Sequence, residues 1–216
     1  MFYGSATWGT VAESVLGLEV ALADGRLIRT GSGANRGKQP FFRHYGPDLT
    51  GLFLSDTGAL GVKVEATIRL IREPACTGYA SFAFENFHDM VDAQTEIGRC
   101  GLAAECFGLD PYLNGQRTMV KDLGSGLKAL GSVVKAGSSL LGGLKDAASI
   151  AAAGLSGFAE GVRYSLHLTA DSSNEADMGW RMQEIRRIAV AARGREIEAV
   201  IPRVIRAQPF KHVGEF

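Results

Sequence analysis

The chain has 216 residues, with 23 basic and 23 acidic side chains and therefore no formal net charge. This length is enough for one large or two small domains, and a neutral chain has no overall field that draws it to nucleic acid. No apolar run approaches the roughly 20 residues that span a bilayer, and the first ten residues lack the basic and apolar regions of a signal peptide. We therefore expect a cytoplasmic protein without a transmembrane segment or a nucleic-acid partner.

Cysteine spacing argues against a metal site. Cys76, Cys100 and Cys106 are irregularly spaced and form no pair of the CxxC type. Structural zinc sites need such pairs, or cysteine and histidine ligands at short spacings, so the sequence predicts no metal. We interpret the three cysteines as reduced, partly buried thiols, which are usual in the cytoplasm.

The first third of the chain predicts a β-hairpin. Residues 15–22 are apolar and rich in strand-forming side chains, and residues 27–30 return as a second strand. The turn between them contains Asp24-Gly25, a dipeptide that tight hairpins favour because it accepts positive φ. The polar, glycine-rich residues 31–39 then predict a loop.

A short helix, a glycine turn and a long strand follow. Residues 48–53 place apolar side chains at helical spacing, and residues 55–61, SDTGALG, predict the turn. Residues 62–71 alternate between apolar and polar side chains, which predicts a strand with one buried face. Pro74 ends this strand because proline cannot donate to a ladder. We place a domain boundary at this proline.

The rest of the chain predicts two β-α-β units separated by an insertion. The expected elements, in chain order, are a strand at 77–84, a helix at 86–98 with an apolar stripe of Phe87, Met90, Val91 and Ile97, a strand at 102–109, a strand at 161–169, a helix at 175–193 and a strand at 196–201. Two such units are typical of a split β-α-β, ferredoxin-like domain. The predicted fold class is therefore α+β.

The insertion, residues 118–159, is rich in Gly, Ala, Ser, Leu and Lys. Its apolar side chains recur at loose helical spacing, but each glycine weakens a helix by up to ~1 kcal/mol relative to alanine. The pattern indicates marginal amphipathic helices. We favour an ordinary surface insertion; an active-site lid and a contact with a membrane surface are the alternatives, and the last would make the protein peripheral to the membrane.

One stretch carries a signal for ligand binding. The sequence contains no Walker loop, Gly-x-Ser-x-Gly elbow, His-Glu-x-x-His helix or Gly-x-Gly-x-x-Gly fingerprint. Within residues 46–69, however, Gly58 and Gly61 allow close approach of another backbone or of a ligand. Backbone N–H groups in such a turn can contact a nucleotide, although glycine turns before strands are also common as purely structural features.

Two long segments carry a family resemblance. VLGLEVALADGRLIRTG at residues 15–31 and GPDLTGLFLSDTGALGVKVEATIRLIREP at residues 46–74 resemble the second half of the FAD-binding domain of the vanillyl-alcohol oxidase / p-cresol methylhydroxylase (PCMH) superfamily. They are most similar to the branch of D-lactate and glycolate dehydrogenases and alkyl-dihydroxyacetone-phosphate synthase. That branch has a Gly-Ser-Glu-Gly-Thr-Leu-Gly-like turn at the flavin nucleotide. Here Asp56, Thr57 and Ala59 replace its Ser, Glu and Thr.

The resemblance implies which residues contact FAD. One group lies in residues 3–10, which look like the tail of a second flavin-contacting loop, and the other lies in the glycine turn and the start of the following strand. The expected contacts are Gly4, Ser5, Gly9, Thr10, Thr57, Gly58, Ala59, Leu60, Gly61, Val62 and Lys63. Main-chain groups make most such contacts, so the three departures in the turn are compatible with cofactor binding.

The resemblance also implies an activity. It indicates an FAD-dependent oxidoreductase that oxidises an alcohol or 2-hydroxy acid by hydride transfer to flavin N5 and passes the electrons to an acceptor that the sequence does not identify. Residues 1–74 would be part of the FAD-binding domain and residues 75–216 part of the substrate-covering cap domain. Since the family's pyrophosphate loop and catalytic histidine have no counterpart here, we expect an interior piece of a longer enzyme, inactive alone. A homo-oligomer is a further expectation.

Four side chains are candidates for substrate contacts. A carboxylate substrate needs a cation or an imidazole near the flavin. Arg163 and His167 lie opposite the apolar face of their predicted strand, and Arg203 and Arg206 lie near the end of the chain. For the first two, a solvated strand face is the explanation we favour. The alternative functions are an alkyl-dihydroxyacetone-phosphate synthase-like flavoenzyme and, from another class, a non-catalytic α/β binding or scaffold module.

Overall fold

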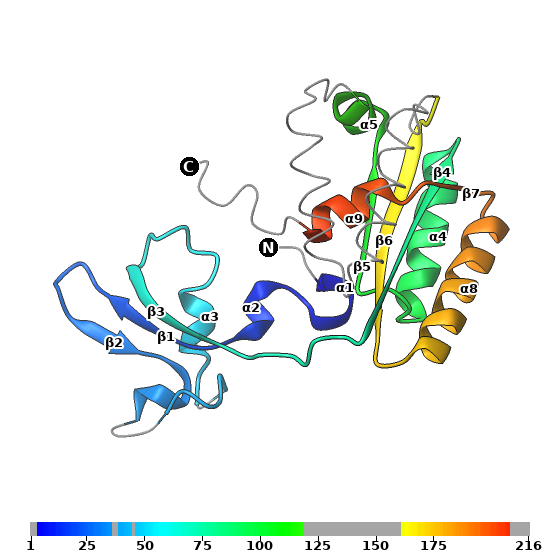
Figure 1. Cartoon of the computed structure of the whole chain (residues 1–216). Helices are drawn as coiled ribbons and strands as arrows, with labels where there is room; N and C mark the ends of the chain where they lie inside the picture. Colours follow the sequence, from blue (N-terminus) through cyan, green and yellow to red (C-terminus); the bar gives the residue numbers. More distant parts are fainter. Residues whose placement is uncertain (1–3, 36–38, 45, 119–160, 208–216) are drawn as a thin grey trace. The chain divides into compact units, whose positions relative to one another are not determined.

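The computed structural model describes residues 4–35, 39–44, 46–118 and 161–207 (Figure 1). The chain divides into two compact units, Met1–Glu73 and Pro74–Phe216, which we call the first and second unit. Apart from its first residue, the insertion expected at 118–159 lies outside the described residues. Among the described helices, none is long and apolar enough to cross a membrane.

The first unit is built on a three-stranded antiparallel sheet in the order β2-β1-β3. Strands β1 (Val15–Ala21) and β2 (Leu27–Arg29) form the predicted hairpin. Gly25 in its turn has φ 84°, and the Leu22 N–H donates to the carbonyl oxygen of Arg26 at 2.9 Å. The hairpin prediction from Asp24-Gly25 is therefore confirmed.

Short helical segments complete the first unit: α1 (Ser5–Trp8), α2 (Val11–Ser14), the 3-10 turn η1 (Gly31–Ala34) and α3 (Leu49–Leu52). Helix α3 lies inside the predicted 48–53 segment. Asp48 caps it by accepting the Gly51 N–H at 3.0 Å, which satisfies one of the N–H groups that a helix start leaves without a partner. A small core forms between β1 and the residue after α3, from Val15, Leu18, Val20 and Phe53.

Strand β3 (Val62–Ile68) differs from its prediction in two ways. It ends three residues before Ile71, and its apolar side chains are not buried: Val62, Val64 and Ile68 are 66%, 53% and 53% exposed. The reason is its position. It is the edge strand of the sheet, whereas α3 and Phe53 pack against β1. Alternation along a strand predicts which side chains share a face, but not whether another layer covers that face.

Gly31 is required by both its conformation and its surroundings. Its φ is +65°, and a Cβ there would lie 2.5 Å from the Leu16 carbonyl oxygen and 2.8 Å from that of Phe42. We expect Gly31→Ala to lower the free energy of unfolding of the first unit by more than Gly25→Ala, for which about 1–2 kcal/mol is expected. Gly25 is the matched control because its φ is +84° and no atom lies within 4 Å of its Cβ position. Denaturant unfolding of both variants measures the difference, and equal losses would contradict the crowding argument.

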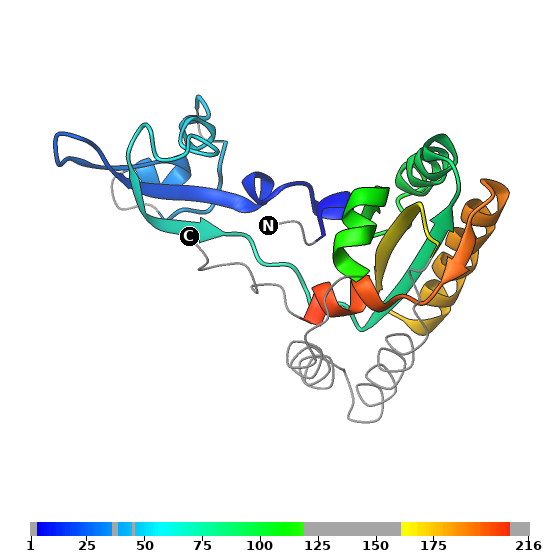
Figure 2. The ribbon, with the colours of Figure 1, turned by 90° about the horizontal axis from the view of Figure 1, so that it is seen from above.

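The second unit has the ferredoxin-like topology that the sequence predicts. Its antiparallel sheet has the order β5-β6-β4-β7, with β4 at Cys76–Phe84, β5 at Glu105–Leu109, β6 at Tyr164–Ser172 and β7 at Arg195–Ile197. Helices α4 (Phe87–Arg99) and α8 (Glu175–Ala191) cover one face of this sheet, while α5 (Pro111–Thr118) and α9 (Val200–Ala207) lie at the other (Figure 2).

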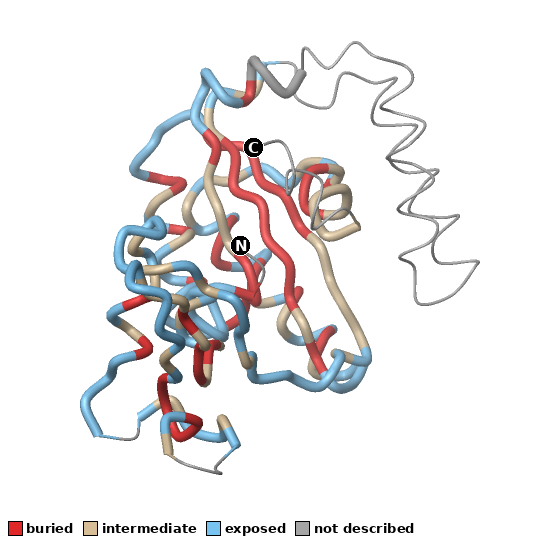
Figure 3. Tube along the Cα trace, turned by 90° about the vertical axis from the view of Figure 1, so that its left-hand side faces the viewer, coloured by how far each residue is buried: buried red, intermediate tan, exposed pale blue. Residues whose placement is uncertain are grey.

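The larger core lies between the sheet and helices α4 and α8. The central strands β4 and β6 are buried along most of their length (Figure 3). Burying a large apolar side chain contributes about 1.5–3 kcal/mol, so this layer provides most of the stability of the unit. Its largest fully buried apolar side chains are Phe82, Phe84, Ile97, Leu102, Leu166, Leu168 and Ile185.

Helix positions were predicted better than strand ends. The helices expected at 86–98 and 175–193 are confirmed as α4 and α8 within two residues at each end. The apolar stripe predicted for α4 is wrong at one residue. Phe87, at the start of the helix, is 50% exposed. The strand expected at 161–169 begins at Tyr164 and continues to Ser172.

The strand expected at 196–201 is mostly absent, and helix α9 begins within it. Only the start of that segment pairs, as part of β7, and the chain is helical from Val200. Pro202 suggests strand termination but is also tolerated in the first turn of a helix, where N–H groups have no intrahelical partner. The helix carries Arg203 and Arg206 to the sheet face that α4 and α8 leave uncovered.

Candidate functional site

The glycine turn between α3 and β3 has a strongly constrained backbone. Ser55, Thr57, Gly58 and Gly61 have φ values of 58°, 54°, 84° and 155°. A left-handed conformation costs an ordinary residue about 1–2 kcal/mol, so specific contacts must hold Ser55 and Thr57 in it. Thr57 through Leu60 are exposed, and their main chain forms an accessible rim.

The Asp56 side chain makes the contacts that hold this turn. Its carboxylate accepts the N–H groups of Gly58 and Leu60, each at 3.2 Å, and forms an ion pair with the Lys63 ammonium. The carboxylate is buried beneath the turn, with 7% of the side chain exposed. The Lys63 hydrogen bond, together with the two backbone donors, holds the pKa of Asp56 below its usual range. Sequence reasoning treated Asp56 as a neutral departure from the family turn and missed this role.

The two glycines of the turn have different roles. At Gly61 a Cβ would lie 2.7 Å from Val20 Cγ1 and 2.8 Å from the Ala21 carbonyl oxygen, so this glycine allows the turn to approach β1. At Gly58 no atom lies within 4 Å of the Cβ position. Glycine is therefore favoured at position 58 by the positive φ alone, and the space beside its Cα is open. Of the other predicted contacts here, Val62 is exposed and Lys63 is engaged by Asp56.

The predicted contacts at the start of the chain lie at helix ends. Gly4 precedes α1 and Gly9 follows it, with φ values of 77° and 75°; Ser5 is the first residue of α1, and Thr10 precedes α2. Helix α2 leads into one end of β1, while Val62 pairs with Ala21 at the other end. A seven-residue strand spans about 20 Å, so β1 keeps the two groups of predicted cofactor contacts that far apart. Their contact with a cofactor stays a prediction.

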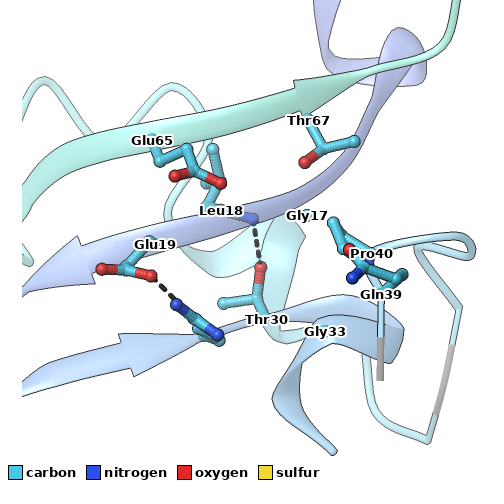
Figure 4. A pocket seen from close by; sticks show the side chains of 10 residues that line it. Gly17, Leu18, Glu19, Thr30, Gly33, Gln39, Pro40, Glu65 and Thr67 are labelled. Atoms are coloured by element: carbon cyan, nitrogen blue, oxygen red, sulfur yellow. Dashed lines mark hydrogen bonds and ion pairs between the residues drawn. The ribbon is translucent and has the colours of Figure 1, made fainter. Parts of the chain in front are cut away.

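A pocket of about 560 Å³ lies on the small sheet (Figure 4). It is polar: Glu19 pairs with Arg29 at 2.7 Å, and Glu65 lies on the neighbouring strand. Glu19 raises the pKa of Arg29 by hydrogen bonding and by its charge. Sequence reasoning missed this pocket, although a glycine inside a strand is a signal for close backbone approach. The lining residues are Gly17, Leu18, Glu19, Arg29, Thr30, Gly33, Gln39, Pro40, Glu65 and Thr67.

In the second unit, a polar sheet face lies opposite α4 and α8. Strand register places alternate residues of β4, β6 and β5 on this face, and most of them are buried although they are polar. Helices α9 and α5 contact the strands on this side (Figure 2). We call these residues the polar face: Tyr79, Ser81, Glu105, Phe107, Ser165, His167, Thr169 and Asp171.

His167 is held in one orientation on the polar face. It is fully buried, so the solvated-face explanation does not apply to it. Its Nδ1 lies 2.8 Å from the Ser81 hydroxyl, and its Nε2 lies 2.8 Å from that of Ser165. The Phe107 ring is tilted against the imidazole at 5.6 Å.

The hydrogen bonds fix which ring nitrogen carries the proton. Asn114 donates its amide N–H groups to the carbonyl oxygens of Leu109 and Arg163, so its Oδ1 is an acceptor. Ser165 donates its single hydroxyl proton to that oxygen at 2.9 Å and must accept from His167. The neutral imidazole is then protonated on Nε2, and its Nδ1 accepts from Ser81.

The three candidate arginines are in different surroundings. Arg206 donates to Asp171 at 3.2 Å, and the Arg203 guanidinium lies 5.5 Å from the centre of the Tyr79 ring. Both belong to α9 beside the polar face. Arg163 is exposed and precedes β6, so it does not lie with His167 inside the sheet. Between these groups, the Thr169 hydroxyl is buried without a hydrogen-bond partner.

Metal-ligating side chains do not gather in the described parts of the two units. Among the described residues, no group of three or more His, Cys, Asp or Glu side chains could hold a metal ion. Cys106 is partly buried, and its burial raises the pKa of the thiol to about 12. A thiol with so high a pKa is a poor nucleophile at neutral pH.

Sequence comparison identifies relatives of this chain. It is 37% identical over 95 residues to the probable mitochondrial D-lactate dehydrogenase of Danio rerio, covering 44% of this chain and 18% of that protein. It is 32% identical over 90 residues to the glycolate oxidase subunit GlcD of Bacillus subtilis, covering 42% of this chain and 18% of that protein. The matched region is less than a fifth of each relative. No protein-family model matches the chain.

Solved structures share the fold over most of the chain. Against 4-ethylphenol oxidase from Gulosibacter chungangensis, 96% of this chain and 39% of that chain align with a TM-score of 0.62 at 16% identity. Against p-cresol methylhydroxylase with bound substrate, 90% of this chain and 37% of that chain align with a TM-score of 0.60 at 18% identity. Identities this low show the fold alone. In sequence the chain therefore resembles D-lactate dehydrogenases and a glycolate oxidase subunit over 90 to 95 residues, and in fold it resembles p-cresol methylhydroxylase and 4-ethylphenol oxidase.

Proposed function

We propose that the chain is part of an FAD-dependent oxidoreductase that oxidises an alcohol or 2-hydroxy acid. The first unit would contribute to the flavin-binding domain, and the second unit would form the sheet of the substrate-covering domain. The observation that carries the proposal is the 37% identity to a D-lactate dehydrogenase over 95 residues. The fold similarity to flavin-family oxidases over 90% or more of the chain supports it.

We propose that a flavin nucleotide contacts the first unit at the glycine turn. The rim from Thr57 to Leu60 presents exposed main chain, and the open space beside Gly58 lets a flat ligand approach. In such an enzyme the flavin supplies the redox chemistry, by accepting a hydride at N5, and the protein binds and orients the reactants. We propose that Thr57, Gly58, Ala59 and Leu60 contact the cofactor through main-chain atoms other than the N–H groups of Gly58, Ala59 and Leu60, which donate to Asp56.

We propose that the polar face of the second unit contributes to substrate binding through α9. The Arg203 guanidinium stacks on the Tyr79 ring, and this contact holds it beside the polar face. Arg206 donates to Asp171 on the same side of the sheet, and we propose Arg203, through its position beside the polar face, as a candidate to receive a substrate carboxylate. We do not extend this role to His167, because both its nitrogens are engaged by serines.

A visible spectrum tests the proposed function. The 216-residue chain and the product of the complete open reading frame are each incubated with FAD, desalted and scanned. We expect the longer product to retain flavin absorbance and to be bleached anaerobically by a 2-hydroxy acid, with recovery when an artificial electron acceptor is added. Flavin that is retained but not reduced by any alcohol or 2-hydroxy acid would instead favour an alkyl-dihydroxyacetone-phosphate synthase-like enzyme.

The competing interpretation is a non-catalytic binding or scaffold module. It predicts no retained flavin in either form and no change in the thermal midpoint on adding FAD. That result would contradict the proposed oxidoreductase, since a ligand that binds the folded state must raise its stability. The electron acceptor, a homo-oligomer and a contact with a membrane surface stay predictions.

A further inference from the structure

The glycine turn contains a charge arrangement that normally receives a bound anion. The N–H groups of Gly58 and Leu60 donate to the two oxygens of one carboxylate, and the Lys63 ammonium donates to the oxygen that Gly58 also contacts. Convergent backbone amides with a nearby cation form anion sites in many proteins. In this chain the anion is the carboxylate of Asp56, which belongs to the turn itself.

We propose that Asp56 is the positioning residue of this turn: its carboxylate serves as a built-in anion that holds the rim from Thr57 to Leu60 in the shape that meets the cofactor. The second half of this statement rests on the proposed function. The first half concerns the turn alone and can be tested without FAD.

The geometry distinguishes this role from an ordinary surface ion pair. Asp24 in the β1–β2 turn also accepts a backbone N–H, from Arg26 at 3.1 Å, and pairs with the Arg26 side chain. Both of those side chains are more than half exposed, at 52% and 72%. Asp56 is 7% exposed and lies between two residues with left-handed backbone, Ser55 and Thr57. Its carboxylate therefore determines a backbone shape that the flanking residues disfavour.

Removal of the carboxylate should leave a site for a small carboxylate. In Asp56→Ala, the two amides and Lys63 face a space into which formate fits. We expect sodium formate, compared with sodium chloride at equal ionic strength, to shift the amide resonances of Gly58 and Leu60 saturably towards their wild-type positions. Wild type should show no such shift. Adding Lys63→Met to the variant should weaken formate binding by roughly tenfold or more, because a charged partner is lost.

Cofactor affinity provides the second readout, measured on the longest product that retains FAD. We expect Asp56→Ala to raise the dissociation constant of FAD by roughly tenfold or more and formate to restore it. Asp56→Asn keeps an acceptor without the charge, so it should bind FAD with intermediate affinity and not respond to formate. Asp24→Ala is the matched control and should leave the FAD affinity unchanged.

Each outcome has a distinct meaning. If formate does not shift the two amide resonances in Asp56→Ala, or shifts them equally in wild type, the proposal that the Asp56 carboxylate acts as a built-in anion is wrong. If formate fills the site but FAD affinity is the same in all variants, Asp56 stabilises the turn without positioning a cofactor, and the proposal fails in its second half. If wild type does not bind FAD, the proposed function fails, while the amide measurement still decides the role of Asp56.

Discussion

We expect replacing His167 by alanine to lower the free energy of unfolding of the second unit by about 3–5 kcal/mol. The substitution leaves the buried Ser81 hydroxyl without its imidazole partner, leaves Ser165 with its bond to Asn114, and opens a cavity beside Phe107. An unsatisfied buried hydroxyl alone costs about 1–3 kcal/mol. The measurement is denaturant unfolding in a Trp8→Phe background, where Trp180 on α8 is the remaining tryptophan and reports the second unit.

Two further variants test the cause of this loss. His88→Ala removes an exposed histidine from α4 and should change stability by no more than about 0.5 kcal/mol. The double variant Ser81→Ala/His167→Ala also removes the Ser81 hydroxyl that the His167 substitution leaves without its partner. Its loss in the free energy of unfolding should therefore be smaller than the sum of the two single losses, by about 1 kcal/mol. Strict additivity would show that the serine–histidine contact is not the source of the effect.

The second large effect concerns the ion pair that joins the start of α4 to the end of α8. Arg193 donates from both Nε, at 3.0 Å, and Nη2 to the carboxylate of Asp89, and Asn86 donates to the same carboxylate at 3.2 Å. Asp89 has 7% of its side chain exposed. We expect Arg193→Ala to lower the thermal midpoint by a few degrees at neutral pH, because the Asp89 carboxylate loses its two guanidinium hydrogen bonds; the effect is limited because the Arg193 side chain is itself 78% exposed. Arg195→Ala, which removes an exposed neighbour, should have little effect.

The same pair predicts a pH dependence. Arg193, and then Asn86, hold the pKa of Asp89 below its ordinary value of 3.8. A group with a lowered native pKa stabilises the fold above its unfolded pKa, and this stabilisation is lost as the pH falls through the native value. Wild type should therefore lose stability from about pH 5 downwards. The difference between wild type and Asp89→Asn should shrink over the same range, and a constant difference would contradict the assignment.

Local chemistry made the regular parts of the fold predictable. Asp24-Gly25 specifies a tight turn by backbone preference alone, and the apolar periods of α4 and α8 identify helices without knowledge of their partners. The order of these elements was then sufficient for the ferredoxin-like arrangement. The family resemblance in residues 15–31 and 46–74 supplied the cofactor, which no periodicity could have shown.

The parts that were missed depend on distant residues. His167 was correctly placed opposite the apolar face, but its surroundings depend on distant residues: Ser81 lies 86 positions away, and Ser165, its other partner, bonds to Asn114 51 positions away. Exposure of the β3 side chains depends on which strand becomes the edge. Asp56 is different: its ligands are two and four residues away, so an acidic residue before a glycine turn was a readable signal.

The order of strands in the second unit affects how this unit folds. The central strands β4 and β6 pair over nine residues, yet Phe84 and its partner Tyr164 are 80 positions apart. Closing such a long loop slows folding, since its entropy is lost before the pairing is gained. The equilibrium penalty grows only slowly, by about 0.6 kcal/mol for each doubling of loop length. The segment between α5 and β6 can therefore vary widely in length during evolution with a small effect on stability and a larger one on the folding rate.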